Sequence, residues 1–231
     1  MIKRILPVFF AMLIFASMFS VTASAKSETI SNVQDAMRLC ITDEMFSIKK
    51  GTLYKDGKKK DDVYVIILSG SNMKWDWKDP RGLQTCLKSG FSRPNLYLNR
   101  LILTVIDEIP KNSKIVLMGH SLGGMVAQQF AASRLIKIRY EIINVLTMGS
   151  PYVKTNDMEG GLYRMVDSGD AVPYLSGAGI ANFWEGNYSY ECNGYFGNPG
   201  AAHFNSYQDG VKWIEYDCFG VKGGTSKIIL S

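Results

Sequence analysis

The chain has 231 residues, of which 46% are hydrophobic and 20% charged, and its formal net charge is +5. This length is sufficient for one domain with a full hydrophobic core. The positive charge is mild, and no Lys/Arg-rich block carries interleaved aromatic residues, so the composition argues against a protein that binds nucleic acid.

The first 25 residues are organised as a cleaved signal peptide. Lys3 and Arg4 precede an apolar stretch from residue 5 to about residue 21, and Ala-Ser-Ala at 23–25 supplies a small-residue cleavage site. An uncleaved membrane anchor is the alternative, because the stretch approaches the length of a membrane span. The cleavage site at its end favours removal. We therefore expect a secreted or periplasmic protein whose mature part, residues 26–231, is a single domain.

The mature chain alternates strand and helix patterns. Residues 29–48 mix apolar and polar positions and are expected to form a helix, whereas residues 55–62 form a charged turn. Short apolar, β-branched runs predict buried strands at residues 63–68, 115–118, 142–148 and 162–166. Residues 96–109 repeat apolar side chains at helical spacing and stop at Pro110. Strands that alternate with helices predict an α/β fold with a parallel or mostly parallel sheet.

The most informative stretch is residues 114–127, where an apolar strand runs into a Gly-His-Ser-Leu-Gly sequence and then into helix formers. Strand, G-x-S-x-G and helix in this order are the context of a nucleophile elbow. The turn holds Ser121 in a strained conformation, so Gly119 and Gly123 must lack side chains where strand and helix nearly touch. Ser121 is then exposed above the sheet, with the N–H groups of the following helix aimed at any oxyanion formed there.

A serine nucleophile requires a base, and that base requires an orienting acid. The chain has two histidines, His120 and His203. His120 lies inside the elbow, where its side chain cannot readily turn back onto Ser121, so we expect it to pack beside the elbow. His203 is therefore the candidate base, on a segment expected to be a loop.

The acid is expected from a strand end between Ser121 and His203, which is the chain order usual for α/β-hydrolases. Asp170 is favoured because the turn that contains it would present it at the carboxyl edge of the sheet. Asp167, which follows the same strand, remains the alternative. Asp157 is expected to be a surface residue of a polar loop.

The segment from residue 175 to residue 202 connects the candidate acid and base, and it is rich in glycine and aromatic residues. It is expected to be a packed loop that covers the sheet edge and, compatibly, one wall of an acyl-binding pocket. The predicted substrate-binding residues are Trp75, Phe183 and Trp184.

Several short motifs occur in the order and separation of a known family. They are Ser69-Gly70-Ser71 after a buried strand with a Trp and an Asp beyond it, Gly90-Phe91 before a long helix, residues 119–124, residues 147–151, Asp170-Ala171-Val172-Pro173, and His203 with a tyrosine four residues later. By these motifs the chain resembles, over roughly residues 60–210, the class 3 lipases of the α/β-hydrolase fold, typified by the fungal triacylglycerol lipases. The G-H-S-L-G-G and D-x-V-P motifs are specific in combination.

The resemblance implies an α/β-hydrolase fold, a mostly parallel sheet flanked by helices, with Ser121 as nucleophile, Asp170 as acid and His203 as base. It also implies that the backbone N–H groups of Ser71 and Leu122 form the oxyanion hole.

Two departures from the family affect the oxyanion loop and the lid. The family usually has an arginine before the Gly-Ser pair, where this chain has Ser69, so the resemblance does not say what braces the loop. Fungal members carry a longer lid, and residues 77–90 leave room here for a short lid or none.

The cysteines all lie in the mature chain, at Cys40, Cys86, Cys192 and Cys218. An even count behind a signal peptide predicts two disulfides, and the spacing does not suit a zinc site. Cys192 and Cys218 bracket His203, and closing that loop would hold the base within reach of its nucleophile, so we predict this pair. The pair Cys40–Cys86 follows by elimination.

These expectations describe a secreted serine hydrolase, a lipase or esterase, that cleaves carboxylic esters of lipids through a Ser-His-Asp acyl-enzyme without a metal or organic cofactor. A phospholipase A1 and an esterase for soluble esters are the enzyme alternatives. An inactive hydrolase-like protein that binds an acyl ligand is the alternative of another class, and the complete Ser/Asp/His set argues against it. The expected partners are a lipid or other acyl-ester substrate and, transiently, a membrane or lipid surface.

Overall fold

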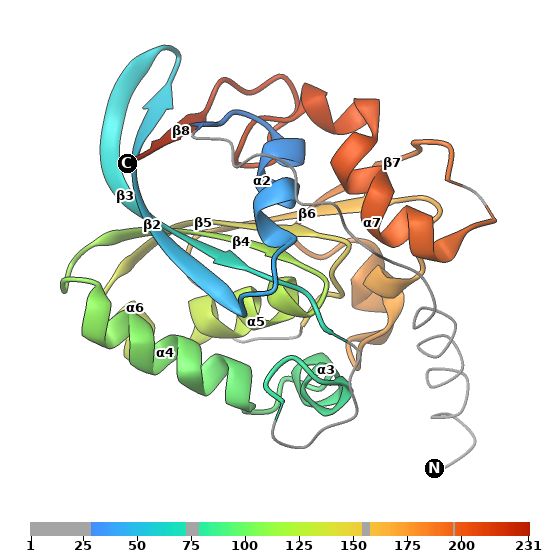
Figure 1. Ribbon diagram of the computed structural model, residues 1–231, viewed down its shortest axis with the longest axis horizontal. Helices are drawn as coiled ribbons and strands as arrows, with labels where there is room; N and C mark the ends of the chain where they lie inside the picture. Colours follow the sequence, from blue (N-terminus) through green and yellow to red (C-terminus); the bar gives the residue numbers. More distant parts are fainter. Residues whose placement is uncertain (1–28, 73–78, 154–157, 196) are drawn as a thin grey trace.

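The computed structural model describes residues 29–72, 79–153, 158–195 and 197–231. An 8-stranded sheet runs through the molecule in the order β1-β8-β2-β3-β4-β5-β6-β7 (Figure 1). The strands from β3 to β7 are parallel. At the other edge β1, β8, β2 and β3 pair antiparallel. The mostly parallel sheet is the one predicted from the alternation of strand and helix patterns.

The elements alternate along the chain much as the sequence patterns suggest. The strands are β1 (Thr29–Ile30), β2 (Phe46–Lys55), β3 (Lys58–Leu68), β4 (Lys114–His120), β5 (Glu141–Met148), β6 (Gly161–Asp167), β7 (Asn187–Glu191) and β8 (Lys227–Leu230). The α-helices are α2 (Val33–Cys40), α3 (Leu83–Gly90), α4 (Leu96–Glu108), α5 (Leu122–Ala132), α6 (Arg134–Lys137) and α7 (Pro199–Asp209). Short 3-10 helices are η3 (Val172–Tyr174), η4 (Gly179–Phe183) and η5 (Val211–Glu215).

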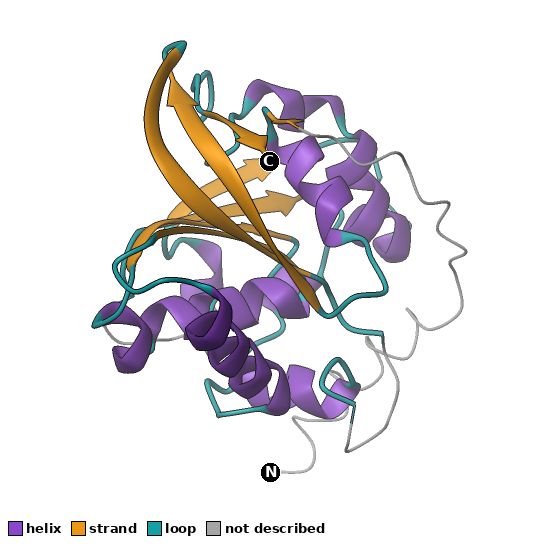
Figure 2. Cartoon of the chain, turned by 60° about the vertical axis from the view of Figure 1, so that its left-hand side comes forward, coloured by secondary structure: helices purple, strands orange, loops and turns teal. Residues whose placement is uncertain are grey.

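Helices cover both faces of the sheet, as Figure 2 shows. Successive side chains of a strand point to opposite faces, and β4 accordingly contributes Leu117 to one apolar core and Val116 to the other. The first core packs against α3 to α6, for example through Leu101 of α4. The second packs against α2, α7 and η5, for example through Met37 and Trp213. All four predicted strands therefore lie side by side as β3 to β6, with their carboxyl ends at one edge.

The N-terminal region differs from the single helix expected over residues 29–48. Helix α2 begins after Asn32, whose side-chain oxygen accepts the N–H of Asp35 at 2.9 Å, and it ends at Cys40. The residues on either side are strands because β1 pairs with β8 and β2 pairs with β3. Both β1 and β2 also pair with β8, which lies near the C-terminal end of the chain, and a local pattern of apolar and polar residues cannot reveal such a pairing.

Residues 55–62 form part of a long hairpin rather than only a charged turn. Strands β2 and β3 continue to Lys55 and Lys58, which pair across the two-residue turn Asp56-Gly57. The φ angles of these turn residues are 51° and 72°. Positive φ at both positions of an Asp-Gly pair is the geometry of a type I′ turn, whose twist suits paired strands. Strand β3 therefore begins five residues before the apolar run predicted at residue 63.

The segment over residues 175–202 is more regular than the loop expected there. It contains η4, the edge strand β7, which pairs in parallel with β6, and the start of α7. His203 consequently lies in a helix and not on a loop. Asn198 caps that helix, since its side-chain oxygen accepts the N–H of Ala201 at 3.1 Å, and Pro199 occupies its first turn.

The four cysteines are free thiols, so the predicted disulfides Cys40–Cys86 and Cys192–Cys218 are not formed. Cys40 belongs to the core on the α2 face of the sheet, and Cys86 belongs to the core on the opposite face. Cys218 is buried, whereas Cys192 is exposed beyond β7. The pairing of Cys40 with Cys86 was predicted by elimination, and the sequence did not reveal that the sheet lies between these two residues. Burial raises the pKa of the Cys40 thiol to about 12 and that of Cys86 to about 11, so both stay protonated at neutral pH.

Three sequence predictions fall on residues outside the described ranges: the signal peptide at residues 1–25, Trp75 and Asp157. Within those ranges, no helix combines the length and the apolar character needed to cross a membrane.

Candidate active site

Ser121 lies in the turn between β4 and α5, with φ 54° and ψ −120°. A positive φ at a residue other than glycine is strained. Its glycine neighbours permit the turn: a Cβ at Gly119 would lie 2.6 Å from the carbonyl carbon of Gly123, and a Cβ at Gly123 would lie 2.4 Å from the carbonyl oxygen of Leu68. Any side chain at either position would therefore push α5 away from the strands.

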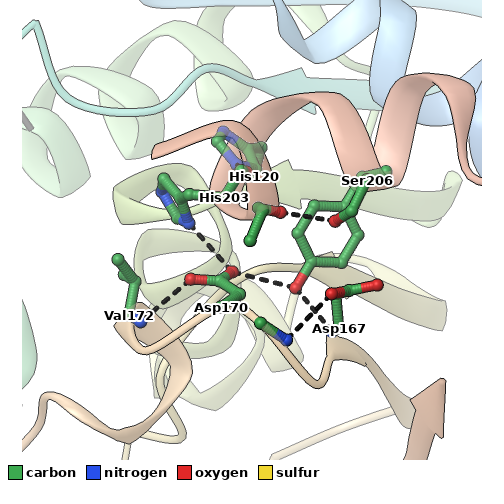
Figure 3. A network of polar contacts seen from close by, with 9 residues as sticks. His120, Asp167, Asp170, Val172, His203 and Ser206 are labelled. Carbon is green, nitrogen blue, oxygen red and sulfur yellow. Dashed lines mark hydrogen bonds and ion pairs between the residues drawn. The ribbon is translucent and has the colours of Figure 1, made fainter. Parts of the chain in front are cut away.

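Asp170 and His203 form a buried hydrogen-bonded pair (Figure 3). The Nδ1 atom of His203 lies 2.9 Å from Oδ2 of Asp170. The same Oδ2 accepts the hydroxyl of Tyr207 at 2.9 Å, and Oδ1 accepts the N–H of Val172 at 2.9 Å. A carboxylate only accepts, so Nδ1 of His203 carries the proton and Nε2 is the basic nitrogen.

Asp167, the alternative acid, points elsewhere. Its Oδ1 accepts the N–H of Gly169 at 2.9 Å, and its Oδ2 accepts the backbone N–H and the side-chain amide of Asn193 at 3.1 and 2.9 Å. In Figure 3 the Asp167 side chain lies apart from His203, which is joined to Asp170 instead. Asp167 therefore ties the end of β6 to the segment after β7.

Tyr207 is part of this network, although its sequence context predicted no role for it. Its hydroxyl donates to Asp170 and accepts the backbone N–H of Asp167 at 2.9 Å. Burial, followed by the charge of Asp170, raises the pKa of Tyr207 well above 10, so the phenol remains a donor. The available signal was its spacing: residues four apart lie on one face of a helix, which places Tyr207 beside His203.

Ser121 and His203 approach the same point at the end of β5. The N–H of Ser121 donates to the carbonyl of Met148 at 3.0 Å. The next residue, Gly149, has φ 58°, and a Cβ there would lie 3.2 Å from Cε1 of His203 and 2.9 Å from Oδ2 of Asp170. Because Gly149 has no side chain, the Asp170–His203 pair can pack against the end of β5. The same strand end holds Ser121 through the Met148 carbonyl.

His120 packs beside the elbow and also holds the helix that carries His203. Its ring lies 4.6 Å from the His203 ring, and its Nε2 lies 2.8 Å from the backbone carbonyl oxygen of His203. A carbonyl only accepts, so Nε2 of His120 carries the proton. Burial, followed by repulsion from His203, lowers the pKa of His120 well below 6.5, so the ring is neutral at neutral pH.

The predicted oxyanion donors flank Ser121. A Cβ at Gly70 would lie 3.3 Å from Cβ of Ser121, so the peptide group that joins Gly70 to Ser71 borders the nucleophile candidate. Leu122 is the first residue of α5, where backbone N–H groups have no partner within the helix. The Ser71 hydroxyl donates to the carbonyl of Arg81 at 2.8 Å, a contact that holds the loop.

The predicted substrate-binding residues Phe183 and Trp184 lie at the surface, with 53% and 57% of their area exposed. The Phe183 ring stacks on Tyr174 at 4.7 Å, and Tyr174 follows the Asp170 turn within η3. Phe91, also exposed, adjoins the same segment, because a Cβ at Gly177 would lie 2.7 Å from its ring. Among the described residues, no cluster of three or more His, Cys, Asp or Glu side chains is arranged to hold a metal ion.

Comparisons with known proteins agree with this geometry at the level of fold. Residues 91–171 match the family described as the PGAP1-like alpha/beta domain. This range carries the elbow and Asp170 and stops before His203. Together with the mostly parallel sheet, it confirms the predicted α/β-hydrolase fold.

One similar solved structure is the Lip2 lipase from Yarrowia lipolytica, with 14% sequence identity and a TM-score of 0.34, where the alignment covers 84% of this chain and 93% of that one. A search of curated proteins finds no significant match.

Proposed function

We propose that this α/β-hydrolase is a secreted serine esterase or lipase that cleaves carboxylic esters of lipids, with Ser121 as nucleophile, His203 as base and Asp170 as acid. The observation that carries the proposal is the buried 2.9 Å contact between Asp170 and His203. This contact lies beside the end of β5, where the Met148 carbonyl accepts the N–H of Ser121, a residue with φ 54°. A strained serine next to a buried acid–base pair is the arrangement that acyl transfer requires.

In this mechanism His203 removes the hydroxyl proton of Ser121 through Nε2 as the serine oxygen attacks the ester carbonyl carbon. Asp170 accepts a hydrogen bond from Nδ1–H and stabilises the imidazolium that forms. The N–H groups of Ser71 and Leu122 donate to the oxyanion of the tetrahedral intermediate. The alcohol leaves with the proton from His203, and water then hydrolyses the acyl-enzyme with His203 again as base.

Exposed aromatic side chains support a lipid as the acyl donor. Phe183, Trp184 and Phe91 present apolar surface on the segment that follows the Asp170 turn or next to it. Burying exposed apolar surface against an acyl chain is favourable by about 25 cal/mol per Å². Export across a membrane is part of the proposal and rests on the sequence of residues 1–25.

The test is fluorophosphonate labelling and hydrolysis of p-nitrophenyl esters, triglycerides and phospholipids by the wild type and Ser121→Ala. We expect the wild type to be labelled and active, and Ser121→Ala to be unlabelled and reduced to the residual catalysis of roughly 10³–10⁴ over water that binding and the oxyanion hole supply. Substrate preference in the panel then separates lipase, phospholipase and soluble esterase. A folded Ser121→Ala protein that keeps most of the activity, or a wild type that binds acyl ligands without hydrolysis, would refute the proposal.

A further inference from the structure

Arg81 connects the predicted oxyanion loop, residues 69–72, to the segment that follows α2. Its Nε donates to the carbonyl oxygen of Gly70 at 2.9 Å. Its Nη1 lies within hydrogen-bond distance of three successive carbonyl oxygens, those of residues 42, 43 and 44, at 3.2, 2.7 and 3.3 Å. One guanidinium therefore joins the loop to a neighbouring segment of the chain.

The backbone of Arg81 contacts the same loop. Its carbonyl oxygen accepts the Ser71 hydroxyl at 2.8 Å and the N–H of Asn72 at 3.2 Å. Its own N–H donates to Oδ1 of Asp79 at 2.8 Å, while Oδ2 of Asp79 accepts the side-chain amide of Asn72 at 2.6 Å. Side chain and backbone of Arg81 thus contact three consecutive residues of the loop.

The contact with Gly70 decides where the N–H of Ser71 points. The carbonyl of Gly70 and the N–H of Ser71 belong to one planar peptide group, and in a trans peptide they point in opposite directions. The described residues contain no cis peptide bond. Because Arg81 holds the carbonyl on one side, the N–H is directed to the other, and this peptide group borders Ser121.

We infer that Arg81 is a positioning residue that aims the Ser71 N–H at the oxyanion, an inference that rests on the proposed function. The other residue that ties the loop to the segment after α2 is Ser69, whose hydroxyl donates to the carbonyl of residue 44 at 2.7 Å and whose N–H donates to that of residue 45 at 3.1 Å. These contacts do not reach the peptide group between Gly70 and Ser71. A lysine cannot replace Arg81, because one ammonium lacks the planar fork that reaches both carbonyl groups.

The test compares Arg81→Lys and Arg81→Ala with the wild type on a short p-nitrophenyl ester. Loss of one oxyanion donor costs about 10²–10³ in kcat, so both variants are expected to lose tenfold or more in kcat with little change in KM. A trifluoromethyl ketone, whose hemiketal oxyanion occupies the same position, should bind more weakly by a similar factor. Ethylguanidinium in solution should restore part of the activity of Arg81→Ala and none in Arg81→Lys. Arg38→Ala is the control, since Arg38 also donates to a backbone carbonyl, that of Gln208, away from the loop.

The outcomes are distinct. If Arg81→Ala does not fold, as judged by circular dichroism, Arg81→Lys decides the question. Wild-type kcat and inhibitor affinity in a folded Arg81→Lys protein that is still labelled at Ser121 would overturn the role of Arg81 and leave the proposed function intact. A loss confined to thermal stability or to KM would likewise overturn it. If the wild type shows no hydrolysis that depends on Ser121, the proposed function fails and this inference fails with it.

Discussion

Replacing Asp170 by asparagine removes one charge and changes one acceptor into a donor at the centre of the polar network. In the wild type, Oδ1 accepts the backbone N–H of Val172, and Oδ2 accepts Nδ1–H of His203 and the hydroxyl of Tyr207, each at 2.9 Å. An asparagine side chain offers one oxygen and one NH₂ group. The N–H of Val172 is fixed by the backbone as a donor, so the amide oxygen is expected to face it and the NH₂ group to face His203.

In that orientation His203 has to accept at Nδ1, and its proton moves to Nε2. The nitrogen that should remove the proton of Ser121 is then already protonated, and the imidazolium loses its stabilising charge. The opposite orientation would restore the tautomer but leave an NH₂ group against the N–H of Val172, two donors without an acceptor in a buried site. The wrong tautomer in a serine hydrolase costs on the order of 10⁴ in kcat, or about 5.4 kcal/mol.

The assay is kcat for a p-nitrophenyl ester, with Asp167→Asn as the matched control. Asp167 is also fully buried and undergoes the same chemical change, but its carboxylate contacts Gly169 and Asn193 and not His203. Asp167→Asn is expected to keep kcat within about tenfold and to lose roughly 1–3 kcal/mol of stability through unsatisfied hydrogen bonds. If Asp170→Asn retained more than a tenth of the activity, or if Asp167→Asn were the inactive variant, the assignment of the acid would be wrong.

Two further predictions concern the residues packed around His203. Gly149→Ala should lower kcat, because its Cβ would lie 2.9 Å from Oδ2 of Asp170, whereas Gly57→Ala, with a similarly positive φ of 72° and open space around it, should cost only the backbone strain of about 1–2 kcal/mol; equal kcat in the two variants contradicts this. Burial lowers the pKa of His120 below 6.5, so below that pH the unfolded chain binds a proton that the folded chain does not. The free energy of unfolding therefore decreases as the pH is lowered. Between pH 7.5 and 5.5 the wild type should lose about 1.4 kcal/mol more unfolding free energy than His120→Gln in urea denaturation; an equal loss would show that His120 does not stay neutral.

Several features of the chain could be predicted because they depend on neighbouring residues alone. The buried strands β3 to β6 are apolar runs of the right length, and the parallel pairing of β3, β4 and β5 follows from the helices between them, α3 and α4 and then α5 and α6. The elbow at Ser121 has a local steric requirement, two glycines around one residue of positive φ, which the G-x-S-x-G pattern displays directly. Local patterns were less informative at residues 29–62, where strand pairing overrides a mixed composition.

Contacts between segments distant in sequence were decided only by the tertiary structure. Asp167 is the last residue of β6 and Asp170 stands three residues beyond it; the sequence favoured Asp170 but kept Asp167 as an alternative, and the packing of α7 shows which carboxylate meets His203. The same holds for the cysteines, since the sheet separates Cys40 from Cys86. It holds for Arg81 as well, whose partners lie about ten and forty residues away. A sequence displays the side chains available for such contacts, but the partners are chosen by where the elements pack, because hydrogen bonds form only between groups that folding brings within about 3 Å.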